Sequence, residues 1–215
     1  MKAPAKPAKP DKPSKSTRPA KPVQPIRRDL PREVRIIGGQ WKRSKLAVAA
    51  FEGLRPTPDR VRETLFNWLG QDLTGWRCLD AFAGSGALGF EAASRGANEV
   101  VLIERERRIA GALADAKLRL KADALRIENT DALSWMARCA PATFELVFID
   151  PPFESELLVP ALDAAVRLVV PSGYVYVESE HLVPAAAMAE RGLQVHRQSR
   201  AGSVHFCLLQ RAESA

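Results

Sequence analysis

The sequence contains few cysteines and no long apolar run. The 215 residues include only three cysteines, Cys78, Cys139 and Cys207, and none of them belongs to a C-x-x-C pair. An odd number of scattered thiols is untypical of a disulfide framework or a zinc site, so we expect reduced cysteines and no metal. No apolar stretch is long enough to cross a bilayer, and none follows the charged N-terminus as in a secretory signal. The sequence therefore predicts a cytoplasmic protein with no membrane segment.

The formal net charge of +7 is distributed unevenly along the chain. Residues 1–30 hold nine bases and two acids, and residues 31–62 hold eight bases and three acids. Residues 63–215 then hold fifteen bases and twenty acids, a net of −5. A basic arm ahead of a mildly acidic body indicates a polyanionic partner. For residues 1–30, a role in solubility alone explains the charge equally well.

The composition divides the chain into three segments. Residues 1–30 combine seven prolines with lysine and alanine and have few large apolar side chains. Such a segment cannot bury enough surface to offset the entropy lost on ordering, so we expect a disordered basic tail. Residues 31–56 are basic with short apolar stretches, which predicts a small N-terminal β extension. Residues 57–215 form the main domain in this division.

The β extension and the start of the main domain have local signals of their own. Val34–Ile37 is a strand-like apolar run and Gly38-Gly39 is a turn signal, which together with the alternating residues 41–50 predicts a β-hairpin. Thr57-Pro58-Asp59 is typical of a helix start, with the threonine as N-cap, the proline at the first helical position and an acid in the first turn. We expect this helix to end near Gly70.

From Trp76 onward the sequence alternates between strand-like and helix-like stretches. We expect strands at Arg77–Phe82, Glu99–Ile103, Arg126–Asn129, Phe144–Ile149, Gly173–Glu178, Gln194–His196 and Val204–Leu209. We expect helices at Ala87–Arg95, Arg107–Lys121, Leu133–Cys139, Glu156–Val169 and Pro184–Arg191. This alternation predicts an α/β fold, a doubly wound and mostly parallel seven-stranded sheet with helices on both faces. In such a sheet, ligands bind beyond the carboxyl ends of the strands.

A glycine-rich loop follows the first of these strands. Gly84-x-Gly86-x-x-Gly89 matches the dinucleotide fingerprint, in which the glycines let the backbone approach a ligand at a helix N-terminus. By itself this pattern is weak. Asp80, four residues earlier, would repel the phosphates of a dinucleotide and would face a cation instead. The loop, including Ser85, is therefore predicted to bind S-adenosylmethionine, which carries an ammonium and a sulfonium group.

Acids also follow the next two strands. Glu104 comes after an apolar strand, where a carboxylate can accept both ribose hydroxyls. Asp131 follows the third strand and could accept from an adenine amino group. Together with their neighbours Arg105 and Ala132, these residues complete the predicted cofactor site. Each acid alone is explained equally well as a solvated residue at a strand end.

The fourth strand ends in Asp150-Pro151-Pro152-Phe153. Each proline fixes φ and supplies no N–H, so the turn is stiff and its carbonyls can accept hydrogen bonds. Asp150 adds a carboxylate, and Phe153 adds a flat apolar face on which a base could stack. The lone pair of an aromatic exocyclic amine is delocalised into its ring. Accepting both amine hydrogens would direct that lone pair towards a methyl donor and stabilise the charge that develops on nitrogen.

These motifs resemble the class I Rossmann-like methyltransferases that have a [DNS]-P-P-[FYW] motif. More narrowly, the chain resembles the RsmD family of 16S rRNA guanine-N2 methyltransferases over about residues 34–210. The specific parts of the resemblance are Gly-Gly-x-Trp at residues 38–41 and Arg-Pro-Thr-x-Asp-Arg-Val-Arg-Glu at residues 55–63. The resemblance implies methyl transfer to the 2-amino group of one guanine in 16S rRNA. The substrate would be the 30S subunit or its assembly intermediate.

A basic surface fits an RNA substrate, because phosphate contacts supply affinity and unstacked loop bases are accessible. Our candidate RNA contacts are Arg35, Lys42, Arg43, Arg55 and Arg60. Arg60 and Arg62 lie on one helix but point to different faces, so at most one of them is expected to face RNA. We expect the protein to act as a monomer.

Four other functions are weighed against this one on the sequence alone. An adenine-N6 DNA methyltransferase or a protein glutamine methyltransferase uses a similar Pro-Pro motif, usually with asparagine in place of Asp150. A non-catalytic RNA-binding assembly factor would have a broken glycine loop or would lack a motif acid, and this sequence shows neither. A dehydrogenase is permitted by the glycine fingerprint, but it would leave Asp80 and the Pro-Pro turn without a role.

Overall fold

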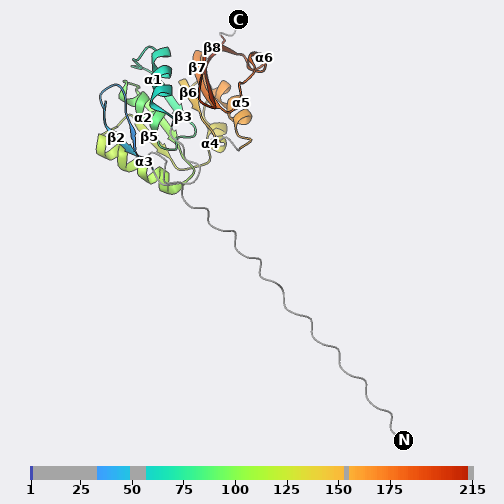
Figure 1. Cartoon of the computed structure of the whole chain (residues 1–215), viewed down its shortest axis with the longest axis horizontal. Coiled ribbons are helices and arrows are strands. Elements are labelled where there is room, and N and C mark those ends of the chain that lie inside the picture. The colour runs from blue at the N-terminus through green and yellow to red at the C-terminus, as the bar shows by residue number, and fades with distance from the viewer. Residues whose placement is uncertain (2–32, 49–56, 153–154, 213–215) are drawn as a thin grey trace.

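The computed structural model describes residue 1 and residues 33–48, 57–152 and 155–212 (Figure 1). The predictions for the tail, for Arg55 and for Phe153 lie outside the described residues. Among the described residues, no helix has the length and apolar character needed to cross a bilayer. Cys78, Cys139 and Cys207 are free thiols, as expected.

Seven strands form the main sheet in the order β5-β4-β3-β6-β7-β9-β8. The first five along the chain are parallel, and the last two form an antiparallel hairpin against the fifth. Their bounds are β3 (Arg77–Asp80), β4 (Glu99–Ile103), β5 (Leu125–Glu128), β6 (Phe144–Ile149), β7 (Val169–Ser179), β8 (Leu193–Ala201) and β9 (Val204–Arg211). Because β4 and β6 lie on opposite sides of β3, a crevice is expected at the carboxyl end of β3.

Helices cover both faces of this sheet, which confirms the predicted doubly wound fold (Figure 1). One face packs against α1 (Asp59–Trp68), α2 (Ala87–Ser94) and α3 (Arg107–Leu120). The other face packs against α4 (Ala132–Arg138), α5 (Leu158–Leu168) and α6 (Ala185–Ala189). Alternate residues of the central strands supply the two cores, because successive side chains of a strand point to opposite faces. Phe148 lies in the first core and Val147 in the second.

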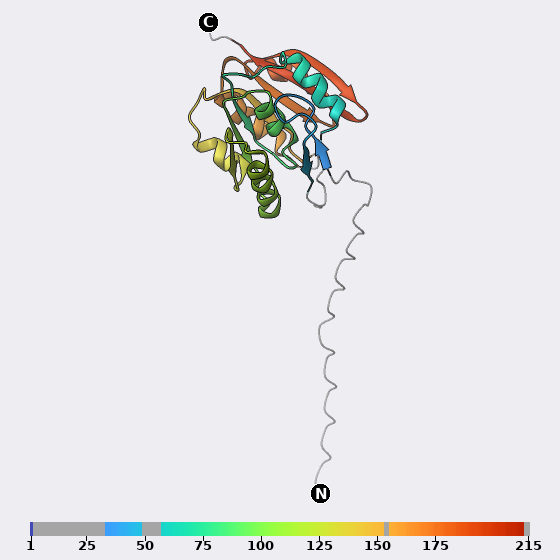
Figure 2. The same ribbon diagram turned by 90° about the vertical axis from the view of Figure 1, so that its left-hand side faces the viewer.

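The structure differs from the sequence-based boundaries mainly at the last strands. β8 continues to Ala201, beyond the predicted end of this strand at His196, although residues 197–200 are polar. Their backbone pairs with β9, with Arg200 opposite His205. An edge strand needs no apolar alternation, because its polar side chains stay in solvent while the ladder of backbone hydrogen bonds forms. Figure 2 shows α1 beside these C-terminal strands, where Trp68 stacks on Phe206 at 5.4 Å.

The predicted N-terminal hairpin is present as two short strands. β1 (Glu33–Arg35) and β2 (Lys45–Ala47) pair antiparallel, with Val34 opposite Leu46. Both of these apolar side chains are buried. Trp41 is half-buried and packs against the first core rather than projecting from the surface.

The hairpin is tied to the main domain through a buried ion pair. Arg62 of α1 and Glu91 of α2 are both 0% exposed, and their closest N···O distance is 3.3 Å. Glu91 also accepts from the backbone N–H groups of Ile37, at 2.9 Å, and Gly38, at 2.8 Å. Arg62 donates to the carbonyl of Arg35 at 2.8 Å. One guanidinium and one carboxylate thus join the hairpin and two helices.

We expect Arg62→Ala to reduce the free energy of unfolding by about 2–3 kcal/mol, because it removes one of the two ion-pair partners of the buried Glu91, which keeps Arg95 at 2.8 Å. Urea denaturation followed by circular dichroism measures the change. Arg60→Ala is the matched control, since Arg60 is exposed one position from the start of the same helix, and its effect should stay within about 0.5 kcal/mol. Equal effects of the two substitutions would contradict the importance of the buried pair.

Candidate active site

The four acids predicted for the site follow four parallel strands. Asp80 ends β3, Glu104 follows β4, Asp131 comes shortly after β5 and Asp150 follows β6. Because these strands run in the same direction, all four acids lie along one edge of the sheet. This is the edge at which open α/β sheets bind their ligands.

The glycine loop lies at this edge, and two of its positions require glycine. Gly86 is the N-cap of α2 and has φ +76°, a left-handed conformation that favours glycine. A Cβ on Gly86 would lie 2.6 Å from Leu113 and 2.8 Å from Phe90. A Cβ on Gly89 would lie 3.1 Å from a carboxylate oxygen of Asp80, so this glycine permits α2 to pack closely on β3.

Asp80 anchors the first turn of α2 to β3. Its Oδ2 accepts from the backbone N–H of Gly89 at 3.0 Å, and the side chain is only 2% exposed. Burial, followed by the charges of Glu104 and Glu178, raises the pKa of Asp80 to about 7 against the opposing hydrogen bonds from Gly89 and Phe82. A cation beside this carboxylate would stabilise its ionised form. The Asp80 carboxylate therefore fits a ligand that carries an ammonium group.

Glu104 and Asp131 also hold backbone N–H groups. The two oxygens of Glu104 accept from Gly84 at 3.0 Å and from Glu106 at 2.7 Å, so its carboxylate connects the glycine loop to the end of β4. Asp131 is the N-cap of α4 and accepts from Ser134 at 2.8 Å, and hydrogen bonds from this residue lower the pKa of Asp131. Each carboxylate keeps lone pairs for a further donor. Their contacts with ribose and adenine remain predictions.

The other predicted cofactor residues border this group. Ser85 is buried within the glycine loop, and Ala132 is buried in the first turn of α4. Arg105 is exposed, and its carbonyl accepts a hydrogen bond from Asn129 at 3.0 Å. All of the predicted cofactor residues therefore lie on or next to the strand-end edge.

Asp150 lies among acids that raise its pKa. Desolvation is the main cause, followed by the charges of Glu178 and Asp80, and together they hold the pKa of Asp150 well above its usual range. The hydroxyl of Thr57 donates to the Asp150 carboxylate and opposes this shift. The predicted N-cap role of Thr57 is therefore wrong: the N-cap is Pro58, which has no side-chain oxygen, and the threonine hydroxyl serves Asp150 instead.

Glu178 and Tyr176 are site residues that the sequence reasoning missed. Glu178 is 3% exposed near the end of β7, and the hydroxyl of Tyr176 donates to its Oε1 at 2.9 Å. The sequence does contain a signal for Glu178, because this acid comes at the end of the apolar part of β7, just as Asp80 and Asp150 come at the ends of β3 and β6. Because β7 is parallel to β6, its carboxyl end lies at the same edge of the sheet as the other strand-end acids.

A small cavity of about 130 Å³ lies beside Glu178 and the two prolines that follow Asp150. Its lining residues are Pro151, Pro152, Ser155, Leu158, Glu178, Ser179, Glu180 and His181. Within this turn, the Pro152 carbonyl accepts from the N–H of Ser155 at 3.0 Å and from its hydroxyl at 2.5 Å. The stiff turn predicted from the two prolines is thus further braced by a hydrogen-bonded serine.

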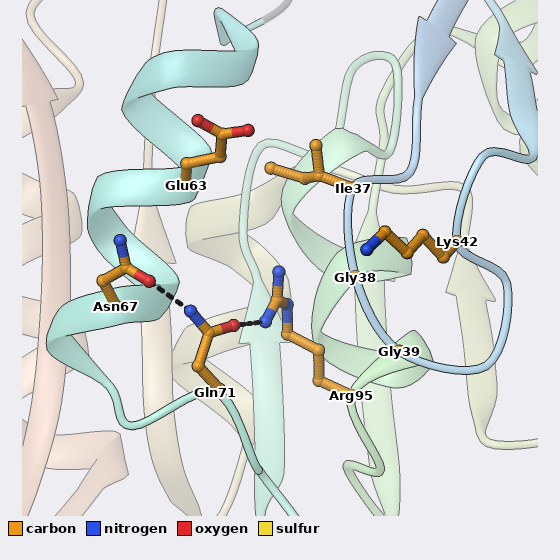
Figure 3. Close-up of a pocket in the computed structure, with 8 residues that line it drawn as sticks. All are labelled: Ile37, Gly38, Gly39, Lys42, Glu63, Asn67, Gln71 and Arg95. Atoms are coloured by element: carbon orange, nitrogen blue, oxygen red, sulfur yellow. Dashed lines mark hydrogen bonds between the residues drawn. The ribbon is translucent and has the colours of Figure 1, made fainter.

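A larger cavity of about 500 Å³ lies elsewhere, between α1, the loop after β1 and Arg95 (Figure 3). Asn67, Gln71 and Arg95 form a chain of hydrogen bonds across it. Arg95 follows the C-terminal end of α2, whereas the glycine loop precedes its N-terminal end. Despite its size, this cavity is therefore separate from the strand-end acids, and the smaller cavity is the one beside the predicted chemistry.

The described RNA candidates are all on the surface. Arg35, Lys42 and Arg43 are exposed on the hairpin, and Lys42 also lines the larger cavity. Arg60 is exposed on α1, whereas Arg62 is buried, which confirms that the two arginines point to different faces. The hairpin and α1 thus both present basic side chains at the surface.

Comparisons with known proteins identify the family of this chain. The sequence profile of the family described as "Conserved hypothetical protein 95" matches residues 34–210. The Escherichia coli K12 protein named "Ribosomal RNA small subunit methyltransferase D" is 42% identical over 186 residues, which cover 83% of this chain and 90% of the relative. The chain belongs to this family, the RsmD methyltransferases.

Further relatives and solved structures support the RsmD family. The Haemophilus influenzae protein of the same name is 42% identical over 153 residues, covering 69% of this chain and 79% of the relative. The structure titled "Putative methyltransferase yhhF from Escherichia coli" superposes with a TM-score of 0.73 at 42% identity, over 85% of this chain and 99% of that one. Membership in the RsmD family makes this chain an S-adenosylmethionine-dependent methyltransferase, and it excludes the dehydrogenase reading.

The buried acid at the end of β3 predicts a pH effect on stability. The folded protein holds the Asp80 proton up to a pKa of about 7, whereas the ordinary value is 3.8. Between these values the folded state binds more protons than the unfolded state, so stability falls as the pH rises, with a slope of up to about 1.4 kcal/mol per pH unit.

We therefore expect Asp80→Asn to flatten the decline in unfolding free energy between pH 5 and pH 7, as measured by urea denaturation at several pH values. Asp131→Asn serves as the control. The pKa of Asp131 is lowered rather than raised, so this substitution should leave the slope in that window unchanged. A slope in Asp80→Asn equal to that of the wild type would show that Asp80 is ionised throughout.

Proposed function

We propose that this chain transfers a methyl group from S-adenosylmethionine to the 2-amino group of a guanine in 16S rRNA of the small ribosomal subunit. The observation that best supports this proposal is the site at the strand ends. There Asp150 lies close to Glu178, and a cavity is lined by Glu178 and the two prolines. Relatives named as small-subunit rRNA methyltransferases support an rRNA substrate. An rRNA substrate also implies a cytoplasmic location.

The residues of the chain divide into a donor side and an acceptor side. On the donor side, the glycine loop, Asp80, Glu104 and Asp131 hold S-adenosylmethionine, which supplies an electrophilic methyl group on a sulfonium. On the acceptor side, Asp150 and a proline carbonyl accept the two hydrogens of the guanine amine. The carbonyl of Pro152 is already occupied by Ser155, which favours that of Pro151.

Asp150 has two effects on the amine nitrogen. By accepting a hydrogen it orients the lone pair, and its charge stabilises the positive charge that develops on nitrogen during transfer. Burial, followed by the charges of Glu178 and Asp80, raises the pKa of Asp150, so this carboxylate binds a proton more readily than an ordinary aspartate does. Asp150 is therefore the group that takes the proton released after methyl transfer. Phe153, the last residue of the Asp150–Phe153 motif, is assigned to stacking on the target base.

RNA binding depends on the exposed basic side chains of the hairpin and α1. Arg35, Lys42, Arg43 and Arg60 contact phosphates, together with Arg55, and the base is turned out of its loop to reach Asp150. The substrate is the 30S subunit or an assembly intermediate, and the enzyme acts as a monomer. The DNA adenine and protein glutamine alternatives receive no support from the names of the relatives.

Loss of the gene tests this function directly. We expect 16S rRNA from cells that lack it to contain less N2-methylguanine, by the equivalent of one nucleotide per ribosome, when its nucleosides are measured by mass spectrometry. Restoring the gene should restore the nucleoside. An unchanged N2-methylguanine content would refute the guanine assignment, and loss of a different methylated nucleoside would identify the correct base.

Asp150→Ala tests the acceptor clamp. We expect turnover to fall at least about 100-fold, because a group that stabilises charge on the reacting atom is lost, while S-adenosylmethionine binding measured by calorimetry stays within about twofold. Asp115→Asn, at an exposed position of α3, is the control and should behave as wild type in both assays. Full turnover by Asp150→Ala would remove Asp150 from the mechanism.

A further inference from the structure

Glu178 and Asp150 occupy neighbouring ends of two parallel strands. In the register of β6 and β7, Ile149 lies opposite Val177, so the next residues along the two strands are Asp150 and Glu178. Adjacent strands are about 4.8 Å apart, which brings two carboxylates to one side of the sheet at a short separation. The charge of Glu178 raises the pKa of Asp150, as expected for acids this close.

The Glu178 carboxylate is held in a defined place beside the cavity. The side chain is 3% exposed, and the Tyr176 hydroxyl donates to Oε1 at 2.9 Å. The Tyr176 ring is itself packed against Phe148, with centroids 6.1 Å apart, and against Phe206, at 6.5 Å. A carboxylate that is positioned in this way loses little conformational entropy when a ligand binds.

The guanine edge next to the 2-amino group matches two adjacent carboxylates. The 2-amino nitrogen carries two hydrogens and the neighbouring N1 carries one, so this edge presents a row of donors. Adenine and 2-aminopurine have an unprotonated N1 with a lone pair, which a carboxylate would repel. One acid suffices to hold the amine, and a second acid beside it can therefore distinguish the bases.

We propose that Glu178 reads the N1–H of the substrate guanine and so selects guanine over bases whose N1 carries no hydrogen. The proposal rests on the guanine-N2 function described above and adds a specificity residue to it. In this arrangement Asp150 accepts from the amine, Glu178 accepts from N1, and Tyr176 positions Glu178. Glu178 makes no bond to the methyl group and takes no proton.

The test compares two RNA substrates that differ at the methylated base. Small-subunit particles are reconstituted with 16S rRNA that carries either guanine or 2-aminopurine at that position, since 2-aminopurine keeps the 2-amino group but has no hydrogen on N1. For wild-type enzyme we expect kcat/KM to favour guanine at least about 100-fold. A wild-type preference of less than about threefold would overturn the proposal without any variant.

Glu178→Gln separates reading of the base from a structural role. The glutamine is nearly isosteric with glutamate, and its NH2 can donate to the unprotonated N1, so we expect the preference for guanine to shrink at least about tenfold. Equal losses on both substrates would show that Glu178 is only structural. Glu178→Asp, which keeps an acceptor, should retain the preference even where kcat falls.

Two controls separate this proposal from the proposed function. Glu156→Gln replaces an exposed acid before α5 and should match wild type on both substrates. Binding of S-adenosylhomocysteine to each variant reports that the fold is intact. If wild-type enzyme forms no N2-methylguanine on the guanine particle, the guanine-N2 function itself fails. If it does so while Glu178→Gln keeps the full preference, only the role of Glu178 fails.

Discussion

The pairing of Arg62 with Glu91 is the interaction on which the arrangement of the N-terminal region depends. Both side chains are fully buried, so their charges must be compensated by each other and by the groups around them. Arg62 uses its other donors on the carbonyls of Arg35 and Thr57, and Glu91 uses its oxygens on the loop that follows β1. These contacts fix the positions of the hairpin, α1 and α2 relative to the sheet. Breaking them would leave buried charged groups without partners, which would greatly reduce the stability of the fold.

This buried network reaches the acceptor side of the site through Thr57. The Thr57 carbonyl accepts from Arg62 at 3.3 Å, and its hydroxyl donates to Asp150. The Asp150 carboxylate is therefore oriented by a residue that also belongs to the buried network of Arg62. The run from Arg55 to Glu63, whose resemblance to the RsmD family was most specific, thus contributes a buried ion pair and an orienting hydroxyl to the site.

The site itself consists of acids at the ends of adjacent strands. Asp80, Asp150 and Glu178 end β3, β6 and β7, which are neighbours in the sheet. Burial, followed by the charges of neighbouring acids, raises the pKa values of Asp80 and Asp150. Such an edge favours ligands that bring cations or hydrogen-bond donors, because these restore the ionised carboxylates. The proposed ligands have this character, since S-adenosylmethionine is cationic and the guanine amine edge is rich in donors.

The sequence by itself determined the fold class, the two faces of the sheet, the glycine loop and the acids that follow four strands. These features depend on local periodicity and on turn residues, which act over a few positions of the chain. The tertiary structure decided the burial of Arg62, the use of Thr57 and the position of Glu178. The helical spacing predicted that Arg60 and Arg62 point to different faces, but it could not show that Arg62 is fully buried. It also could not show that β7 lies next to β6 in a register that brings Glu178 beside Asp150. Those facts follow from the order of strands in the sheet, because only the folded sheet brings together residues 28 positions apart.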